Sequence, residues 1–227
     1  MKRALVLGGT GVVGSAVLRE LARRDVPAAF VYHRAEERAK ALAAELGHAP
    51  VRCDLADAAA TTAMLAEQTA DVVIHCAGVS SATPLAELDA AAWDAAFAIN
   101  VRAAFLACRW VAARGTRCDV VLVGGLDRAQ SLPLPVHYAA SQGALSALAM
   151  AAAHELGPRD IRVNVVALGP LEAGMSEGLA SRRLRDYETF SALRRAGTAA
   201  EAAKVIVWLA LENSLIQGKV VSVNGGI

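Results

Sequence analysis

The sequence is poor in aromatic side chains and carries almost no excess of charge of either sign. Aromatic residues make up 4% of the 227 positions although 55% are hydrophobic, so alanine, valine and leucine supply the apolar content. That composition suits buried parallel strands and closely packed helices. The formal net charge of +1 argues against nucleic acid or an anionic membrane as the main partner.

Cysteines are few and lie far apart. The four are Cys53, Cys76, Cys108 and Cys118, with no CxxC spacing and no histidine at metal-ligand spacing from them, so we expect no metal site. Buried thiols in a reducing compartment are the expected state. The N-terminal apolar run is broken by glycines and is too short for a signal peptide. No uncharged apolar run of ~18 residues predicts a membrane span, and we expect a cytoplasmic protein without membrane contact.

What the chain does contain is an alternation of short valine-rich runs with longer segments rich in alanine and leucine. This alternation predicts an α/β fold of the Rossmann type, a doubly wound parallel sheet of about seven strands with helices on both faces. Without a linker or repeat, residues 1–227 are predicted to form one domain. The irregular segment 172–197 is predicted to be a lid-like insertion near the strand ends. The predicted strands are 4–7, 28–32, 50–53, 71–75, 119–123, 161–167 and 220–223, and the predicted helices lie near 12–24, 35–47, 57–68, 88–113, 136–156 and 199–211.

A glycine-rich loop follows the first predicted strand and opens the first predicted helix. Its sequence is GGTGVVG, with glycines at 8, 11 and 14. A dinucleotide site needs such glycines for a tight turn, for close approach of the backbone to a pyrophosphate, and for a helix N-terminus directed at it. Turn chemistry alone would give the same pattern, but the position between strand and helix favours the nucleotide site. The candidate cofactor contacts here are Gly8, Thr10, Gly11, Val12, Val13 and Gly14.

The end of the second predicted strand indicates which nucleotide binds. A carboxylate there would bind the ribose hydroxyls of NAD, whereas this chain has His33 and Arg34. An arginine at this point can hold a 2′-phosphate, which favours NADP(H); the alternative is that Arg34 merely begins a solvated helix. After the third predicted strand, Asp54, followed by Leu55, is either an acceptor for the adenine amino group or a helix N-cap.

Once Tyr138 in HYAASQ is placed, the chain from about residue 3 to residue 226 resembles the short-chain dehydrogenase/reductase family, especially its 3-ketoacyl-carrier-protein reductase-like members. The stretches CDLAD, HCAG at 75–78, FAINVRAAF, ELGPRDIRVNVVALGP and IQGKVVSVNGG carry the resemblance. The resemblance implies further cofactor contacts at Cys76, Ala77, Gly78 and Gly169. It also implies a ketone or β-ketoacyl thioester as substrate, either a small molecule or bound to a carrier protein.

The family's four catalytic positions are only half retained. The resemblance places its tyrosine acid at Tyr138 and its water-holding asparagine at Asn100. The lysine that binds the nicotinamide ribose falls on Gln142, and the carbonyl-polarising serine falls on Gly125. Gln142 shares a helix face with Tyr138. Its amide can hydrogen-bond ribose hydroxyls, but it brings no positive charge. The candidate catalytic residues are therefore Tyr138, Asn100 and Gln142.

These losses predict slow reduction by the family's mechanism. A missing cation costs ~10- to 1000-fold in rate, and a missing oxyanion donor costs on the order of 10²–10³. Ser131, His137, Asp127 and Arg128 lie nearby in the sequence but none restores the charge. Ser141 is interpreted as a small helix-packing residue.

Two readings of the function follow. The first is an NADP(H)-dependent oxidoreductase with an atypical site. The second is a non-catalytic homologue that binds nucleotide or serves as a structural subunit, beside an active reductase. The same scaffold carrying a different reaction is a third possibility.

The resemblance further implies a homo-oligomer, dimer or tetramer, or a hetero-oligomer with an active reductase. A basic cluster in the lid-like segment, either solvated or facing an anionic substrate, comprises Arg182, Arg183, Arg185, Arg194 and Arg195.

Overall fold

The strands that the structure describes form one parallel sheet. The computed structural model describes residues 2–125, 134–178 and 181–227, and in this part of the chain the sheet has seven strands in the order β3-β2-β1-β4-β5-β6-β7. The strand order has its topological switch point between β1 and β4. Open α/β sheets bind their ligands at such a point. The strands are β1 (Ala4–Leu7), β2 (Ala28–Tyr32), β3 (Ala49–Arg52), β4 (Val72–His75), β5 (Cys118–Gly125), β6 (Ile161–Leu168) and β7 (Val220–Val223).

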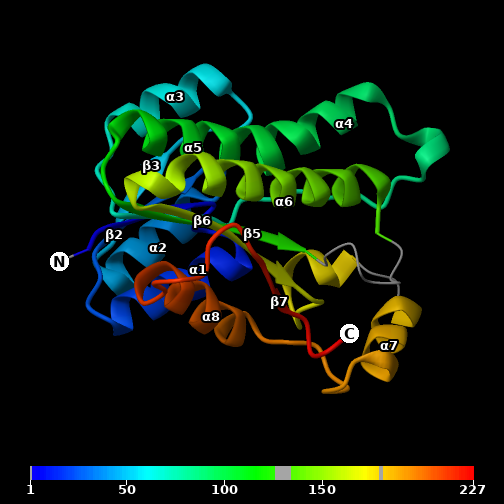
Figure 1. The fold of residues 1–227 in the computed structure, drawn as a ribbon. Coiled ribbons are helices and arrows are strands. Elements are labelled where there is room, and N and C mark those ends of the chain that lie inside the picture. The colour runs from blue at the N-terminus through cyan, green and yellow to red at the C-terminus, as the bar shows by residue number, and fades with distance from the viewer. Residues whose placement is uncertain (1, 126–133, 179–180) are drawn as a thin grey trace.

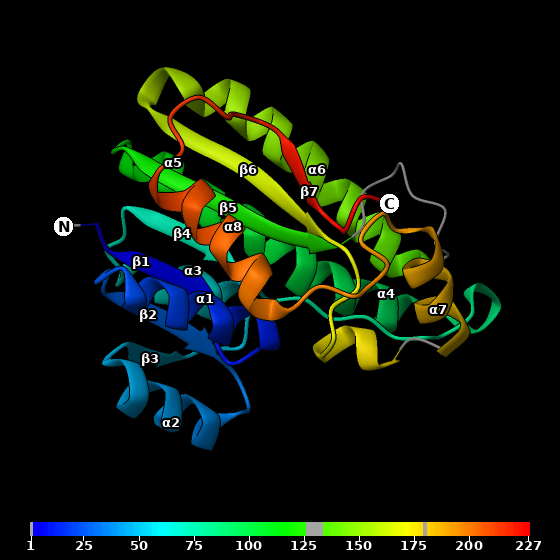
Figure 2. The ribbon, with the colours of Figure 1, turned by 90° about the horizontal axis from the view of Figure 1, so that it is seen from below.

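Helices cover both faces of the sheet (Figure 1). On one face lie α1 (Val12–Arg23), α2 (Glu36–Leu46) and α8 (Ala199–Leu211). On the other lie α3 (Ala58–Ala66), α4 (Ala90–Phe97), α5 (Ala103–Arg114) and α6 (Val136–Leu156). Figure 2 shows α7 (Ser181–Phe190) beyond the strand ends to which the arrowheads of β5 and β6 point. The predicted doubly wound fold is confirmed.

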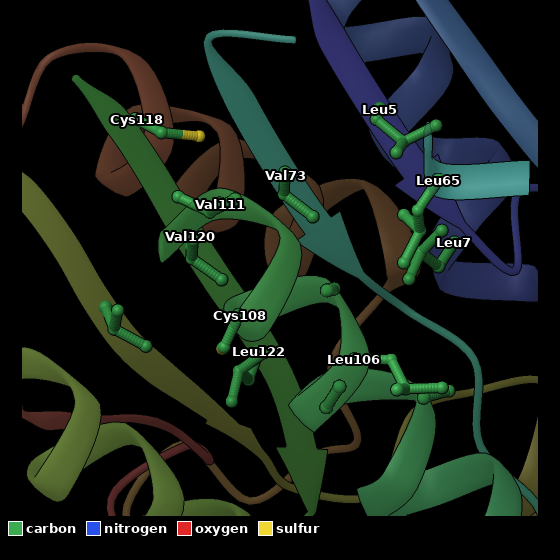
Figure 3. Close-up of a cluster of buried hydrophobic side chains, with 14 of the residues drawn as sticks. Leu5, Leu7, Leu65, Val73, Leu106, Cys108, Val111, Cys118, Val120 and Leu122 are labelled. Carbon is green, nitrogen blue, oxygen red and sulfur yellow. The ribbon is translucent and has the colours of Figure 1, made fainter. Parts of the chain in front are cut away.

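Alternating side chains of each strand supply two separate cores. In β1, Leu5 and Leu7 contribute to the core under α3, α5 and α6, whereas Ala4 and Val6 contribute to the core under α1, α2 and α8. Figure 3 shows the first core, where Val120 and Leu122 of β5 share a face. Because both faces of a doubly covered parallel sheet are buried, its central strands are rich in valine and other apolar residues. Three of the four cysteines, at 53, 108 and 118, lie buried in the first core and are free thiols.

The structure differs from the sequence prediction in two places near the site. The helix predicted over 88–113 is divided by a π-helical turn, Ala98–Arg102, between α4 and α5. The irregular segment 172–197 contains a 3-10 helix, Gly174–Gly178, and the whole of α7. Within the described residues, the stretch Ala90–Arg114 is long and apolar enough to cross a membrane by length and composition; half of its most apolar window is buried in the protein.

Candidate nucleotide and catalytic site

A cavity of about 540 Å³ lies at the carboxyl ends of the strands. It extends from the glycine-rich loop after β1 to the first turns of α6, and the segment after β6 forms another wall. The cavity therefore occupies the switch point at which doubly wound folds bind nucleotides. It brings together many of the predicted residues, namely Gly11, Val12, Val13, Cys76, Ala77, Gly78, Asn100, Tyr138, Gln142 and Gly169.

The glycines of the loop are required by close backbone contacts. Gly8 has φ +82, and a Cβ there would lie 2.7 Å from the backbone N and Cα of Ala77. A Cβ on Gly14 would overlap the carbonyl oxygen of Gly8 and lie 2.9 Å from Cα of Gly9. The loop is thus packed against the end of β4 and against the start of α1. A turn by itself would not need glycine at both Gly8 and Gly14. Without side chains at these two positions, the backbone of the loop can also lie directly against a ligand.

The N-terminus of α1 is suited to a phosphate. Its N-cap residue, Gly11, gives no side-chain hydrogen bond, and the first turn holds no acidic residue. The leading N–H groups of a helix lack intrahelical partners, and the helix dipole favours an anion there. In the described part of the chain, the single charged side chain that lines the cavity is Arg38, whose Nη2 donates to Ser15 Oγ at 3.3 Å. Positive charge and free N–H groups therefore meet at this end.

Arg38 was not singled out from the sequence. The predicted His33 and Arg34 are exposed residues between β2 and α2, and neither lines the cavity. Arg38 lies in the first turn of α2, whereas Arg34 precedes the N-cap residue Ala35, so helical spacing from Arg34 gave no signal that Arg38 faces the loop. His33 Nδ1 lies 3.7 Å from Oδ1 of Asp54.

The carboxylate of Asp54 belongs to a turn before α3. Its Oδ1 accepts from Ala56 N at 2.9 Å. The N-cap of α3 is Asp57, which accepts from the N–H groups of Ala59 and Ala60. The helix-cap alternative for Asp54 was therefore wrong, because the cap lies three residues further on. Leu55 beside it is buried.

Asn100 lies in the π-helical turn, and three hydrogen bonds fix its side chain to residues outside that turn. The residue is 1% exposed, and its Oδ1 accepts from Val79 N at 2.8 Å. Its Nδ2 donates to Val79 O at 3.0 Å and to Ser141 Oγ at 2.9 Å. Single π turns inside α-helices are frequent at functional sites. Here the turn holds Asn100 against the chain that follows β4 and against α6.

Tyr138 lies in the first turn of α6, with its phenol packed on the end of β5. A Cβ on Gly125 would overlap the Tyr138 hydroxyl and lie 3.1 Å from its Cε1 and Cζ. Burial raises the pKa of Tyr138 to about 12. Among the described residues that line the cavity, none places a positive charge next to Tyr138. Nothing therefore offsets the effect of burial on its pKa. Without a bound cofactor, the phenol of Tyr138 therefore stays protonated at neutral pH.

Gln142 is buried, 8% exposed, and both ends of its amide have partners in the protein. Its Oε1 accepts from the backbone N of Gly125 at 2.7 Å. Its Nε2 donates to Ser141 Oγ at 3.1 Å, and that hydroxyl in turn donates to the carbonyl oxygen of Tyr138 at 2.7 Å. Ser141, interpreted from the sequence as a packing residue, is thus the junction between Asn100 and Gln142.

Two further residues have roles that the sequence did not reveal. His137 is buried, and its Nε2 accepts from the backbone N of Ser81 at 3.2 Å, which fastens the chain after β4 to α6. Gly169 lines the cavity, and a Cβ there would lie 2.6 Å from the hydroxyl of Tyr187 in α7. Gly169 therefore also admits the side chain that anchors α7. Burial raises the pKa of the Cys76 thiol to about 12, so this cavity-lining thiol stays protonated.

The basic cluster of the lid-like segment lies outside the cavity as far as the structure describes it. Arg182, Arg185 and Arg194 are exposed, and Arg195 forms an ion pair with Glu201. Ser131, Asp127 and Arg128 lie outside the described residues. No group of three or more potential metal-ligating side chains occurs among residues 2–125, 134–178 and 181–227.

Comparisons with known proteins agree with this geometry. A family model described as "Enoyl-(Acyl carrier protein) reductase" matches residues 10–227. The chain is 31% identical over 229 residues to the cyclic-di-GMP-binding biofilm dispersal mediator protein of Escherichia coli (strain K12), covering 99% of this chain and 96% of that protein. It is 29% identical over 239 residues to the 3-oxoacyl-[acyl-carrier-protein] reductase MabA of Mycobacterium tuberculosis, covering 100% of this chain and 92% of MabA.

A solved structure shares the same architecture. The crystal structure of BdcA in complex with NADPH superposes with a TM-score of 0.91 at 28% identity, covering 100% of this chain and 94% of BdcA. Given the doubly wound sheet, the glycine-rich loop beside β4 and the family-model match over nearly the whole length, the chain belongs to the short-chain dehydrogenase/reductase family, among its ketoacyl reductase-like members.

Proposed function

We propose that this protein is an NADP(H)-dependent oxidoreductase that acts on a ketone or a β-ketoacyl thioester. The observation that carries the proposal is the continuous cavity from the α1 N-terminus to Tyr138 and Asn100. Its retained parts are those that bind a dinucleotide and deliver a proton. The name of MabA, a 3-oxoacyl-[acyl-carrier-protein] reductase, supports this substrate class.

The residues present fit NADP(H). The uncapped N-terminus of α1 is suited to the pyrophosphate, and Arg38, with Arg34, to the 2′-phosphate. Cys76, Ala77, Gly78 and Gly169 would line the remaining length of the nucleotide. When bound, NADPH supplies a hydride. The NADPH complex of BdcA, a protein of the same fold, supports this choice of cofactor.

Tyr138 is the proposed proton donor. In reduction of a carbonyl group its hydroxyl would give up the proton, and the tyrosinate left behind would need stabilisation. Burial of the phenol raises its pKa to about 12, and Gln142 brings no positive charge, so this transfer is uphill at neutral pH. Asn100 contributes a fixed polar group beside the chain after β4. We therefore expect slow turnover, with rate limited by proton delivery.

The substrate end of the cavity is largely apolar. Leu134, Pro135, Leu171 and Met175 line it, and hydroxyl groups come from serines at 80, 81 and 176. An uncharged, apolar reacting end fits this lining. A carrier protein or another anionic group would then contact the exposed arginines of α7 outside the cavity.

A second candidate function is favoured by the contacts of Gln142. Its amide bonds Gly125 N and Ser141 Oγ. The side chain at the position of the family's lysine therefore makes its hydrogen bonds within the protein. A nucleotide-binding subunit without turnover would have this property. The Escherichia coli relative is named as a cyclic-di-GMP-binding protein, so cyclic di-GMP is a second ligand to test.

The two functions are separated by binding and turnover measured together. NADPH, NADH and cyclic di-GMP are titrated by fluorescence or calorimetry, and NADPH oxidation is followed with a β-ketoacyl thioester. The oxidoreductase predicts NADPH binding and slow turnover that is lost in Tyr138→Phe. Absence of NADPH binding at millimolar cofactor would overturn it. Binding without turnover, in wild type and Tyr138→Phe alike, would establish the binding subunit.

We also propose a homo-oligomer in the cytoplasm. Phe105 of α5 and Met150 of α6 are exposed apolar side chains on neighbouring helices. Light scattering of the purified chain tests this: a dimer or tetramer supports the proposal and a monomer contradicts it. Co-purification with an active reductase would support the hetero-oligomer instead.

A further inference from the structure

Two glycines close β5, and each faces one side chain of α6. A Cβ on Gly124 would lie 2.9 Å from Oε1 of Gln142. A Cβ on Gly125 would overlap the hydroxyl of Tyr138. Real Cβ atoms essentially never approach other atoms this closely. The glycine pair therefore leaves the space that Gln142 and Tyr138 occupy.

The contact between Gln142 and the strand is also a hydrogen bond. Gly125 is the last residue of β5, and its N–H donates to Gln142 Oε1 at 2.7 Å. A lysine at 142 has three donors and no acceptor, so it would leave this N–H without its partner. At this partly buried strand end, an N–H that loses its partner costs stability. The strand end therefore specifies an acceptor at position 142.

The other end of Gln142 extends the network to the π-helical turn. Ser141 Oγ accepts from Gln142 Nε2 at 3.1 Å and from Asn100 Nδ2 at 2.9 Å. Asn100, Ser141 and Gln142 are each less than a tenth exposed. Fully bonded buried networks hold their members in a single arrangement. One chain of hydrogen bonds thus joins β5, α6 and the π-helical turn.

We propose that Gln142 is a positioning residue that fastens the end of β5 to α6 and, through Ser141, fixes Asn100, and that Gly124 and Gly125 are its structural counterparts. In this arrangement Gln142 is not a ligand of the nucleotide ribose. The arrangement ties residue 142 to the backbone N–H of Gly125. Its bearing on catalysis rests on the proposed function, whereas the contacts themselves do not.

The test follows the amide proton of Gly125 by hydrogen exchange in NMR, without cofactor. Gln142→Met keeps the size of the side chain and removes both hydrogen bonds, so exchange at Gly125 is expected to accelerate at least ~10-fold. Gln142→Glu retains the acceptor and should keep Gly125 protected. The matched control is Ser146→Ala, because Ser146 Oγ bonds Gln142 O within the same helix; it should leave Gly125 unchanged.

A binding measurement separates positioning from ribose recognition. NADPH affinity of Gln142→Met is expected to stay within ~3-fold of wild type, whereas loss of a direct ribose hydrogen bond would weaken it ~10-fold. Unchanged exchange at Gly125 in Gln142→Met, or a 10-fold loss of NADPH affinity in that variant, would overturn the proposal. If wild type fails to bind NADPH, the proposed function fails, and the exchange data still decide the role of Gln142.

Discussion

The hydroxyl of Tyr138 occupies the volume that any side chain at Gly125 would need. Gly125→Ala should therefore destabilise the protein by about 1–3 kcal/mol, because overpacking forces a neighbour to move. Urea unfolding measures this cost. The cost should fall when Tyr138→Phe removes the hydroxyl, which a double-mutant cycle detects.

Gly143 provides the control for that experiment. It lies in α6 one residue beyond Gln142, and a Cβ there meets nothing within 4 Å. Gly143→Ala should be neutral or stabilise by up to about 1 kcal/mol, because alanine is the better helix former. Equal destabilisation by the two substitutions would show that the Tyr138 contact is not the cause.

Arg38 should contribute more to NADPH affinity than to NADH affinity. Its guanidinium lies beside the glycine-rich loop, bonded to Ser15 Oγ, and a charge-assisted hydrogen bond to a phosphate is worth about 1.5–3 kcal/mol. Arg38→Ala is expected to weaken NADPH by ~10-fold or more, measured by fluorescence titration with both nucleotides. Lys40→Ala, on the same helix and paired with Glu36 and Glu37, is the control. Equal weakening of NADH would assign Arg38 to the pyrophosphate instead.

His75 should make stability depend on pH. It is fully buried at the end of β4, and burial lowers its pKa to about 4, although the backbone of Asn100 and Ile99 acts in the opposite direction. The unfolded chain takes up this proton near pH 6.5 and the folded chain does not. Stability is thus intact above pH 6.5 and is lost as pH falls towards 4, by on the order of 3 kcal/mol.

Urea unfolding at pH 7 and pH 5 measures this loss. In His75→Gln the dependence on pH across this window should shrink. His154→Gln, at an exposed position of α6, should leave it as in wild type. An unchanged pH dependence in His75→Gln would contradict the assignment.

The fold could be predicted from the sequence because its signals are local. The alternation of valine-rich runs and amphipathic segments defines parallel strands and covering helices. The helix over 136–156 was predicted to the residue, as was β7. The π-helical turn escaped prediction because Ala, Ile, Asn, Val and Arg suit an α-helix equally well. The helix α7 escaped because its apolar residues are few and it is held by tertiary contacts, such as Tyr187 bonding Asn224 O at 2.6 Å.

The sequence predicted which residues form the site. It did not predict which atoms those residues contact. Residue identity placed Tyr138, Asn100 and Gln142 in one cavity. No pattern in the sequence shows that Gln142 Oε1 turns to a strand N–H, because that bond joins residues 17 positions apart through packing of α6 on β5. The cation of the cavity, Arg38, could not be recognised from Arg34, because Arg34 lies before α2 and helical spacing does not relate the two. Both cases depend on side-chain direction, which composition does not encode.

The π-helical turn makes the site sensitive to chain length. The N–H of Ala103 bonds Ala98 O, five residues back, so Ala98–Arg102 holds one residue more than an α-helix needs. Deleting one residue here would restore ordinary helix and swing Asn100 by about 100° relative to α5. A one-residue gap at this point would thus remove Asn100 from the site while nearly every amino acid around it stays the same. When related sequences are compared, their length between α4 and α5 tells as much about the site as their letters do.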